Sequence, residues 1–118
     1  MQSPPLILIV DDDAEMRAYL EMALSGRGYR LFAADAPSGW AFQEIPSLAF
    51  VDLVTNGEPA EPFVRQLDAA GARVVLMTGL SGESPVVKAC VEAGCCRVLH
   101  KPFSLAALRT LIDELLPR

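Results

Sequence analysis

The sequence of 118 residues lacks most of the features that mark a specialised class of protein. Its three cysteines, Cys90, Cys95 and Cys96, form no C-x-x-C pair, which excludes a disulfide framework and a cysteine zinc site. We expect them to be small buried apolar residues, with a redox role for the adjacent pair as the alternative. No apolar run is long enough to span a membrane, and no charged and then apolar leader precedes the first apolar segment.

Positive charge is also scarce, because 10 lysines and arginines stand against 15 acidic residues, for a net charge of -5. Such a chain does not neutralise phosphates broadly, which disfavours non-specific binding of nucleic acid. Hydrophobic residues make up 52% of the sequence, enough for a core and too many for a disordered chain. We therefore expect a single domain over residues 1–118 that is cytoplasmic and binds neither nucleic acid nor membrane.

Apolar runs alternate with helical patterns five times along the chain. The run Leu6–Val10 is too short for a globular helix and is apolar throughout, which is typical of a strand buried on both faces. The alternation predicts an α/β fold with a parallel sheet, right-handed crossovers and helices on both faces. We predict strands at 6–10, 29–33, 48–53, 73–77 and 97–100, and helices at 13–25, 35–46, 58–70, 84–93 and from 104 onward.

Chemically active side chains follow four of these five strands. They are Asp11, Asp12 and Asp13 after the first strand, Asp52 at the third, Thr78 after the fourth and Lys101 after the fifth. The carboxyl ends of parallel strands share one edge, where open α/β sheets bind their ligands, so we expect these groups to lie together. Asp12 or Asp13 can cap the first helix, and Asp35 after the second strand is interpreted as a helix cap.

This predicted edge gathers three carboxylates, from Asp11, Asp12 and Asp52, which repel one another unless they are partnered. Lys101 offsets one charge, and Mg2+ would offset two more, because it prefers a few carboxylate oxygens, a backbone carbonyl and retained waters. A cation beside a carboxylate indicates phosphoryl chemistry, in which aspartate is a known acceptor. The edge therefore suits an aspartate that becomes phosphorylated, with a hydroxyl and an ammonium ready to receive the phosphoryl group.

Four motifs at this edge resemble, in order and spacing, the receiver domain of two-component response regulators. They are Val10-Asp11-Asp12-Asp13, Asp52-Leu53, Thr78-Gly79 and Lys101-Pro102-Phe103. The resemblance covers essentially the whole chain. It implies a flavodoxin-like, three-layer α/β/α fold whose five-stranded parallel sheet has the order 2-1-3-4-5.

The same resemblance implies a role for each residue of the edge. Asp52 would be the phosphoacceptor, Thr78 would hydrogen-bond the phosphoryl group and Lys101 would pair with it. The Lys101-Pro102 bond would be cis, and Gly79 would keep the path to Asp52 open. The ligands of Mg2+ would be Asp11, Asp12, Asp52 and the backbone carbonyl of Val54.

Partners follow from the resemblance as well. A histidine kinase or a histidine phosphotransfer protein would donate the phosphoryl group. The receiver would catalyse its own phosphorylation and dephosphorylation rather than turn over a substrate. A downstream protein target would bind through the last helices and the fifth strand, and we expect a single-domain switch with no DNA-binding output.

Three positions depart from the pattern of the family. Val98 stands where an aromatic residue is usual, and Asn56 stands where a proline is usual. Leu80, two residues past Thr78, is interpreted as an apolar cover that slows attack by water. The alternatives are a receiver-like binding module not regulated by phosphorylation, an excised receiver of a longer protein, and a hydrolase, which the absence of a second acid at Val54 disfavours.

Overall fold

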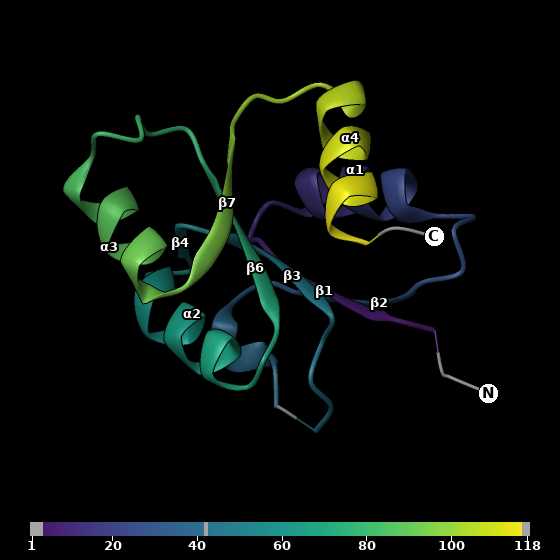
Figure 1. Cartoon of the computed structure of the whole chain (residues 1–118), viewed down its shortest axis with the longest axis horizontal. Helices are drawn as coiled ribbons and strands as arrows, with labels where there is room; N and C mark the ends of the chain where they lie inside the picture. Colours follow the sequence, from purple (N-terminus) through teal and green to yellow (C-terminus); the bar gives the residue numbers. More distant parts are fainter. Residues whose placement is uncertain (1–3, 42, 117–118) are drawn as a thin grey trace.

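A parallel five-stranded sheet forms the centre of the fold (Figure 1). The computed structural model describes residues 4–41 and 43–116. Its neighbouring strands are all parallel, and counted along the chain within this sheet their order is 2-1-3-4-5, so the predicted topology is confirmed. From one edge to the other, the strands are β2 (Arg30–Ala34), β1 (Leu6–Val10), β3 (Leu48–Asp52), β6 (Arg73–Thr78) and β7 (Cys95–His100).

Two α-helices cover each face of this sheet, which gives the predicted three layers (Figure 1). On one face lie α1 (Ala14–Leu24) and α4 (Leu105–Leu115). On the other face lie α2 (Ala60–Ala69) and α3 (Pro85–Ala93). In the parts of the chain that the structure describes, no helix has both the length and the apolar character needed to cross a membrane.

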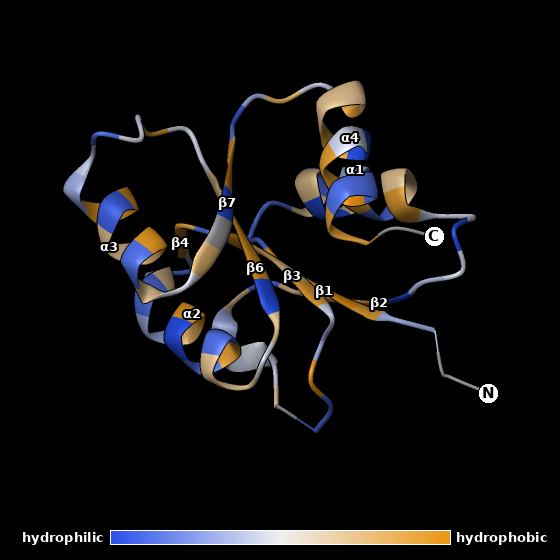
Figure 2. Cartoon of the chain, viewed as in Figure 1, coloured by the Kyte–Doolittle hydropathy of each residue, from blue (hydrophilic) through white to orange (hydrophobic). Residues whose placement is uncertain are grey.

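The central strand β1 is apolar along its whole length, and all five of its side chains are buried. Side chains alternate between the faces of a strand, so Leu8 and Val10 join the core beneath α2 and α3, whereas Ile7 and Ile9 join the core beneath α1 and α4. Each such burial contributes about 1.5–3 kcal/mol. The strands form a hydrophobic band between helices that carry hydrophilic residues (Figure 2).

Helix caps set where the chain leaves the sheet edge. Asp13 is the N-cap of α1, because its Oδ1 accepts a hydrogen bond of 2.9 Å from the backbone N–H of Glu15. This settles the choice between Asp12 and Asp13 and leaves the carboxylate of Asp12 to the edge. Ser104 caps α4 as predicted, since its hydroxyl accepts from the N–H of Ala107 at 3.0 Å.

A short hairpin connects β3 to α2. It consists of β4 (Val54–Thr55) and β5 (Glu58–Pro59), which pair antiparallel around Asn56 and Gly57. Both turn residues have positive φ, 49° and 79°, a conformation that asparagine and glycine tolerate best. Helix α2 therefore begins two residues later than predicted, because residues 58 and 59 belong to the hairpin.

The helix predicted over residues 35–46 is wrong. The described part of this segment holds one 3-10 turn, Pro37–Gly39, and residue 42 lies outside the described residues. Pro37 lies near the start of the segment, Gly39 disfavours a helix, and helical backbone is disfavoured for the residue before Pro46, so too few residues remain to offset the cost of helix nucleation. Tertiary contacts hold the segment instead. Arg30 forms an ion pair with Glu44, and the rings of Trp40 and Phe32 pack edge to face with their centroids 5.1 Å apart.

Other predictions differ little from the structure. Strand β2 lies one residue later than predicted, and β7 begins two residues earlier. Asp35 does not cap a helix, since the N-cap of the 3-10 turn is Ala36. Cys90 and Cys95 are buried, as expected, whereas the side chain of Cys96 lies outside what the structure describes.

Candidate functional site

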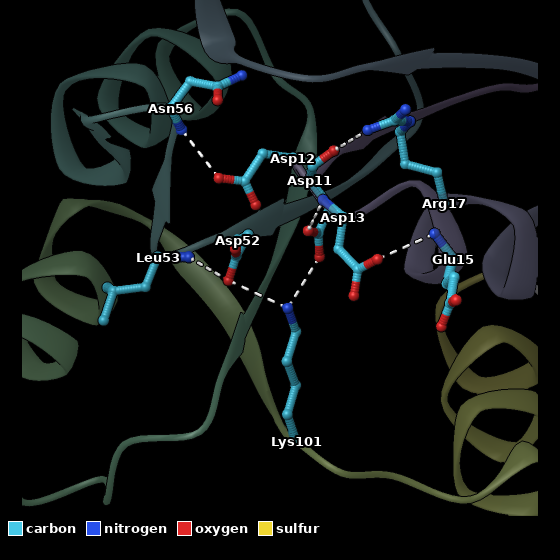
Figure 3. A network of polar contacts seen from close by, with 9 residues as sticks. All are labelled: Asp11, Asp12, Asp13, Glu15, Arg17, Asp52, Leu53, Asn56 and Lys101. Atoms are coloured by element: carbon cyan, nitrogen blue, oxygen red, sulfur yellow. Dashed lines mark hydrogen bonds and ion pairs between the residues drawn. The ribbon is translucent and has the colours of Figure 1, made fainter.

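Three carboxylates meet at the carboxyl edge of the sheet (Figure 3). Asp11 follows β1, Asp12 is the next residue, and Asp52 ends β3. Each contributes one oxygen, and these three oxygens lie within 4.8 Å of one another. Asp11 is fully buried, Asp52 is half-buried and Asp12 is exposed, so the cluster opens to solvent on one side.

Lys101 joins two of these acids. Its Nζ lies 2.8 Å from Oδ2 of Asp11 and 3.3 Å from Oδ1 of Asp52 (Figure 3). The lysine follows β7, and its backbone N–H donates to the carbonyl of Thr78 at 2.8 Å. The Lys101-Pro102 peptide bond is cis, as the resemblance implied. One ammonium between two carboxylates places positive charge next to Asp52.

Asp11 accepts hydrogen bonds through both its side chain and its backbone carbonyl. Its Oδ1 accepts from the N–H of Asp13 at 2.9 Å, and its carbonyl accepts from Nη1 of Arg17 at 2.7 Å. Together with Lys101, these contacts satisfy a carboxylate whose side chain is 1% exposed. Asp11 is therefore a fixed part of the edge.

Asp52 is the acid whose protonation the site shifts. Burial, and then the negative charge of Asp11, raise the pKa of Asp52, while the charge of Lys101 and hydrogen bonds from Lys101 and the N–H of Leu53 oppose that rise. For Lys101, burial lowers the pKa, but the hydrogen bond and charge of Asp11 and the charge of Asp52 outweigh it, so its pKa is raised. The lysine thus stays protonated, and its charge only partly offsets the effects that raise the pKa of Asp52.

Asp12 has a partner that sequence reasoning missed. The backbone N–H of Asn56 donates to Oδ2 of Asp12 at 3.1 Å, and Nδ2 of Asn56 donates to the carbonyl of Asp35 at 2.9 Å (Figure 3 shows the first contact). Asn56 therefore ties the hairpin to the end of β2 and to the exposed acid. An asparagine before glycine, just past a strand that ends in an acid, is the one signal that could have suggested it.

Thr78 ends β6, next to β3, and is buried. Its hydroxyl accepts from the N–H of Leu80 at 3.0 Å, so it is engaged by the loop that follows its own strand. Gly79 between them is exposed, and a Cβ placed there would lie 3.9 Å from the carbonyl of Lys101. The structure thus places Thr78 on the same edge as the acids but bonded to its own loop.

The donor set fits a small hard cation. Three carboxylates and one ammonium leave two uncompensated negative charges, which is the charge that a divalent cation neutralises. Carboxylate oxygens are also the ligands that Mg2+ prefers. The fourth predicted ligand, the carbonyl of Val54, lies two residues past Asp52 at the start of β4, and its role stays a prediction.

Comparison with known proteins identifies the family. The family model for the response regulator receiver domain matches residues 7–113. The chain belongs to this family. The KDP operon transcriptional regulatory protein KdpE of Escherichia coli is 30% identical over 95% of this chain and 51% of its own length. Sporulation initiation phosphotransferase F of Bacillus subtilis is 27% identical over 94% of this chain and 93% of its own length.

Several curated relatives are longer than the receiver domain described here. Protein PetR of Rhodobacter capsulatus, 32% identical over 98% of this chain, is matched over 50% of its own length. The chain therefore spans about half the length of KdpE and of PetR. The receiver domain is the part that it shares with them, as the four sequence motifs predicted.

Solved structures show the same fold as this receiver domain. The BeF3-activated DrrB receiver domain superposes with a TM-score of 0.87 at 21% identity, covering 98% of this chain and 99% of that one. A two-component response regulator from Clostridium difficile superposes with a TM-score of 0.85 at 21% identity, covering 97% of each chain. The flavodoxin-like prediction is thereby confirmed.

Proposed function

We propose that this receiver domain is a Mg2+-dependent phosphoacceptor and that Asp52 accepts the phosphoryl group. The observation that carries the proposal is the placement of Asp52: its Oδ1 lies 3.3 Å from Nζ of Lys101, beside the acidic pair. A half-buried aspartate next to two more carboxylates lowers the stability of the fold, so a purely structural role does not account for its position. Asp11, Asp12, Asp52 and the Val54 carbonyl would hold Mg2+, which supplies positive charge to the phosphoryl oxygens.

The transfer uses an oxygen of Asp52 as the nucleophile. This oxygen attacks the phosphorus of a phosphohistidine, the new P–O bond forms, and the P–N bond breaks with its electron pair left on the imidazole. The ammonium of Lys101, already in contact with Asp52, pairs with a phosphoryl oxygen as charge builds there. The Thr78 hydroxyl donates to another phosphoryl oxygen once it is released from Leu80.

Dephosphorylation returns the domain to its starting state. Water attacks the phosphorus, the P–O bond to Asp52 breaks, and inorganic phosphate leaves a free carboxylate. The domain is then a switch that catalyses its own phosphorylation and dephosphorylation, and it turns over no separate substrate. The Leu80 side chain is 46% exposed beside this edge, where it would hinder the attacking water.

A histidine kinase or a histidine phosphotransfer protein is the proposed donor in the cytoplasm. The proposed output is a contact with a downstream protein through α3, β7 and α4. Val86 and Val91 support this choice, because both are exposed apolar side chains on α3. The net charge of -5 supports protein rather than nucleic acid as the partner.

The intact mass of the protein after incubation with acetyl phosphate tests the proposal. We expect one phosphoryl adduct that forms with Mg2+, fails to form with a chelator, and is absent from an Asp52→Asn variant. A histidine phosphotransfer protein supplies the second donor. If neither donor labels a folded protein that binds Mg2+, the domain is a receiver-like binding module without phosphoryl chemistry.

A further inference from the structure

The backbone of Leu80 is held at both its N–H and its carbonyl. Its N–H donates to Oγ1 of Thr78 at 3.0 Å, and its carbonyl lies 3.1 Å from Nδ1 of His100. Because a carbonyl oxygen only accepts hydrogen bonds, Nδ1 of His100 must carry the proton in this contact. The imidazole therefore anchors the loop between β6 and α3.

This anchor acts on a residue of the proposed switch. His100 is paired with Thr78 in the register of β6 and β7, and the next residue, Lys101, donates its N–H to the carbonyl of Thr78. The backbone of Thr78 is thus fixed to β7, and its hydroxyl is engaged by the loop that His100 anchors. His100, Leu80 and Thr78 form one connected chain of hydrogen bonds at the end of β7.

We propose that His100 is a positioning residue that favours the unphosphorylated state by anchoring Leu80 against Thr78. The inference rests on the proposed function, in which the Thr78 hydroxyl leaves the N–H of Leu80 to reach a phosphoryl group on Asp52. That exchange requires the Leu80 peptide to move or to give up its partner. The hydrogen bond from His100 stabilises the peptide in place and so opposes the exchange.

The magnitude follows from the loss of one hydrogen bond. Removing the His100 contact should raise the population of the state with a free Thr78 hydroxyl by about fivefold, the effect of a typical net hydrogen bond. A ligand that binds only that state should then bind about fivefold more tightly, since its apparent affinity scales with the competent fraction. Beryllofluoride, a phosphoryl mimic, is a suitable ligand because it reports an equilibrium rather than a balance of two rates.

Two variants at this position separate the donor from the ring. His100→Phe keeps a planar ring and removes the donor, whereas His100→Asn keeps a donor at the place of Nδ1. His100 is exposed, so both substitutions leave the core untouched. The first measurement, made without beryllofluoride, is hydrogen exchange at the Leu80 amide by NMR. We expect about fivefold faster exchange in His100→Phe and near wild-type exchange in His100→Asn.

The second measurement is a beryllofluoride titration of the same three proteins in Mg2+. We expect the apparent dissociation constant to fall about fivefold in His100→Phe and to stay near the wild-type value in His100→Asn. Three outcomes would overturn the inference but leave the proposed function standing. They are unchanged Leu80 exchange in His100→Phe, unchanged beryllofluoride affinity in His100→Phe, and equal effects in both variants. A wild-type protein that takes neither beryllofluoride nor a phosphoryl group would overturn the proposed function and the inference with it.

Discussion

Asn56 donates its backbone N–H to the carboxylate of Asp12 at 3.1 Å, from a residue 44 positions away along the chain. It does so with a φ of 49°, which turns the hairpin back over the sheet edge. The side chain of the same residue reaches the carbonyl of Asp35. The only exposed acid of the cluster is in this way fixed by a backbone donor that a proline at position 56 would lack.

Substitution of Asn56 should report both parts of this arrangement. Asn56→Gly and Asn56→Ala each remove the side-chain hydrogen bond to Asp35, but only alanine is strained at positive φ. We expect Asn56→Ala to be less stable than Asn56→Gly by about 1–2 kcal/mol in urea denaturation. Equal stabilities would mean that the turn relaxes away from the positive φ.

Asp12 should matter for the metal and not for the fold. Asp12→Asn removes one charged ligand from an exposed position, so we expect Mg2+ affinity to fall by about tenfold in calorimetric titration while folding stability is retained. Asp13→Asn is the matched control, because asparagine also caps a helix and the change is the same one residue later. A similar loss of Mg2+ affinity in both variants would mean that Asp12 acts through the overall negative charge of the edge and not as a ligand of the metal.

Asp52→Asn should stabilise the unphosphorylated protein at neutral pH. The folded state raises the pKa of Asp52 through burial and the charge of Asp11, so protonation of this group favours folding. The stabilisation from a protonated Asp52 is complete below the pKa of this group in the unfolded chain, about 4, and is lost as pH rises through its raised pKa in the folded state. The gain of Asp52→Asn over wild type, measured by denaturation in the absence of Mg2+, should therefore shrink from pH 7 towards pH 4. A gain that does not vary with pH would contradict this account.

Lys101→Met should impair both phosphorylation and stability. The variant leaves Asp11 with no cation in contact with its carboxylate, and a buried charge that loses its partner costs about 3–5 kcal/mol. Phosphorylation by acetyl phosphate should slow by at least about tenfold, the loss of one charge-assisted contact in the transition state.

A surface lysine supplies the control for this variant. Lys88→Met removes an exposed ion pair with Glu83, 3.3 Å long, and should cost less than about 1 kcal/mol with no change in phosphorylation. Adding Asp11→Asn to Lys101→Met should recover part of the lost stability, because it removes the unpaired charge. If the double variant is no more stable than Lys101→Met, the lost stability comes from packing of the lysine side chain rather than from the unpaired charge.

Hydrophobic patterning by itself determined the sheet and the edge where the site lies. A run of five apolar residues such as Leu6–Val10 must be buried on both faces, so it becomes a central parallel strand, and the acids that follow it lie at the carboxyl edge. The same reasoning brought Asp52, Thr78 and Lys101 to that edge. The cap at Ser104 was also predicted locally, whereas the sequence offered both Asp12 and Asp13 for the first helix and the structure decided for Asp13.

Only the tertiary structure decided the contacts that cross between elements. The segment after β2 has two prolines and a glycine, so its local preference for helix is weak, and contacts with Arg30 and Phe32 set its path. The bond from Asn56 to Asp12 and the anchor from His100 to Leu80 join residues far apart in sequence. No periodicity encodes such pairs, because each depends on which two loops the folded sheet brings side by side.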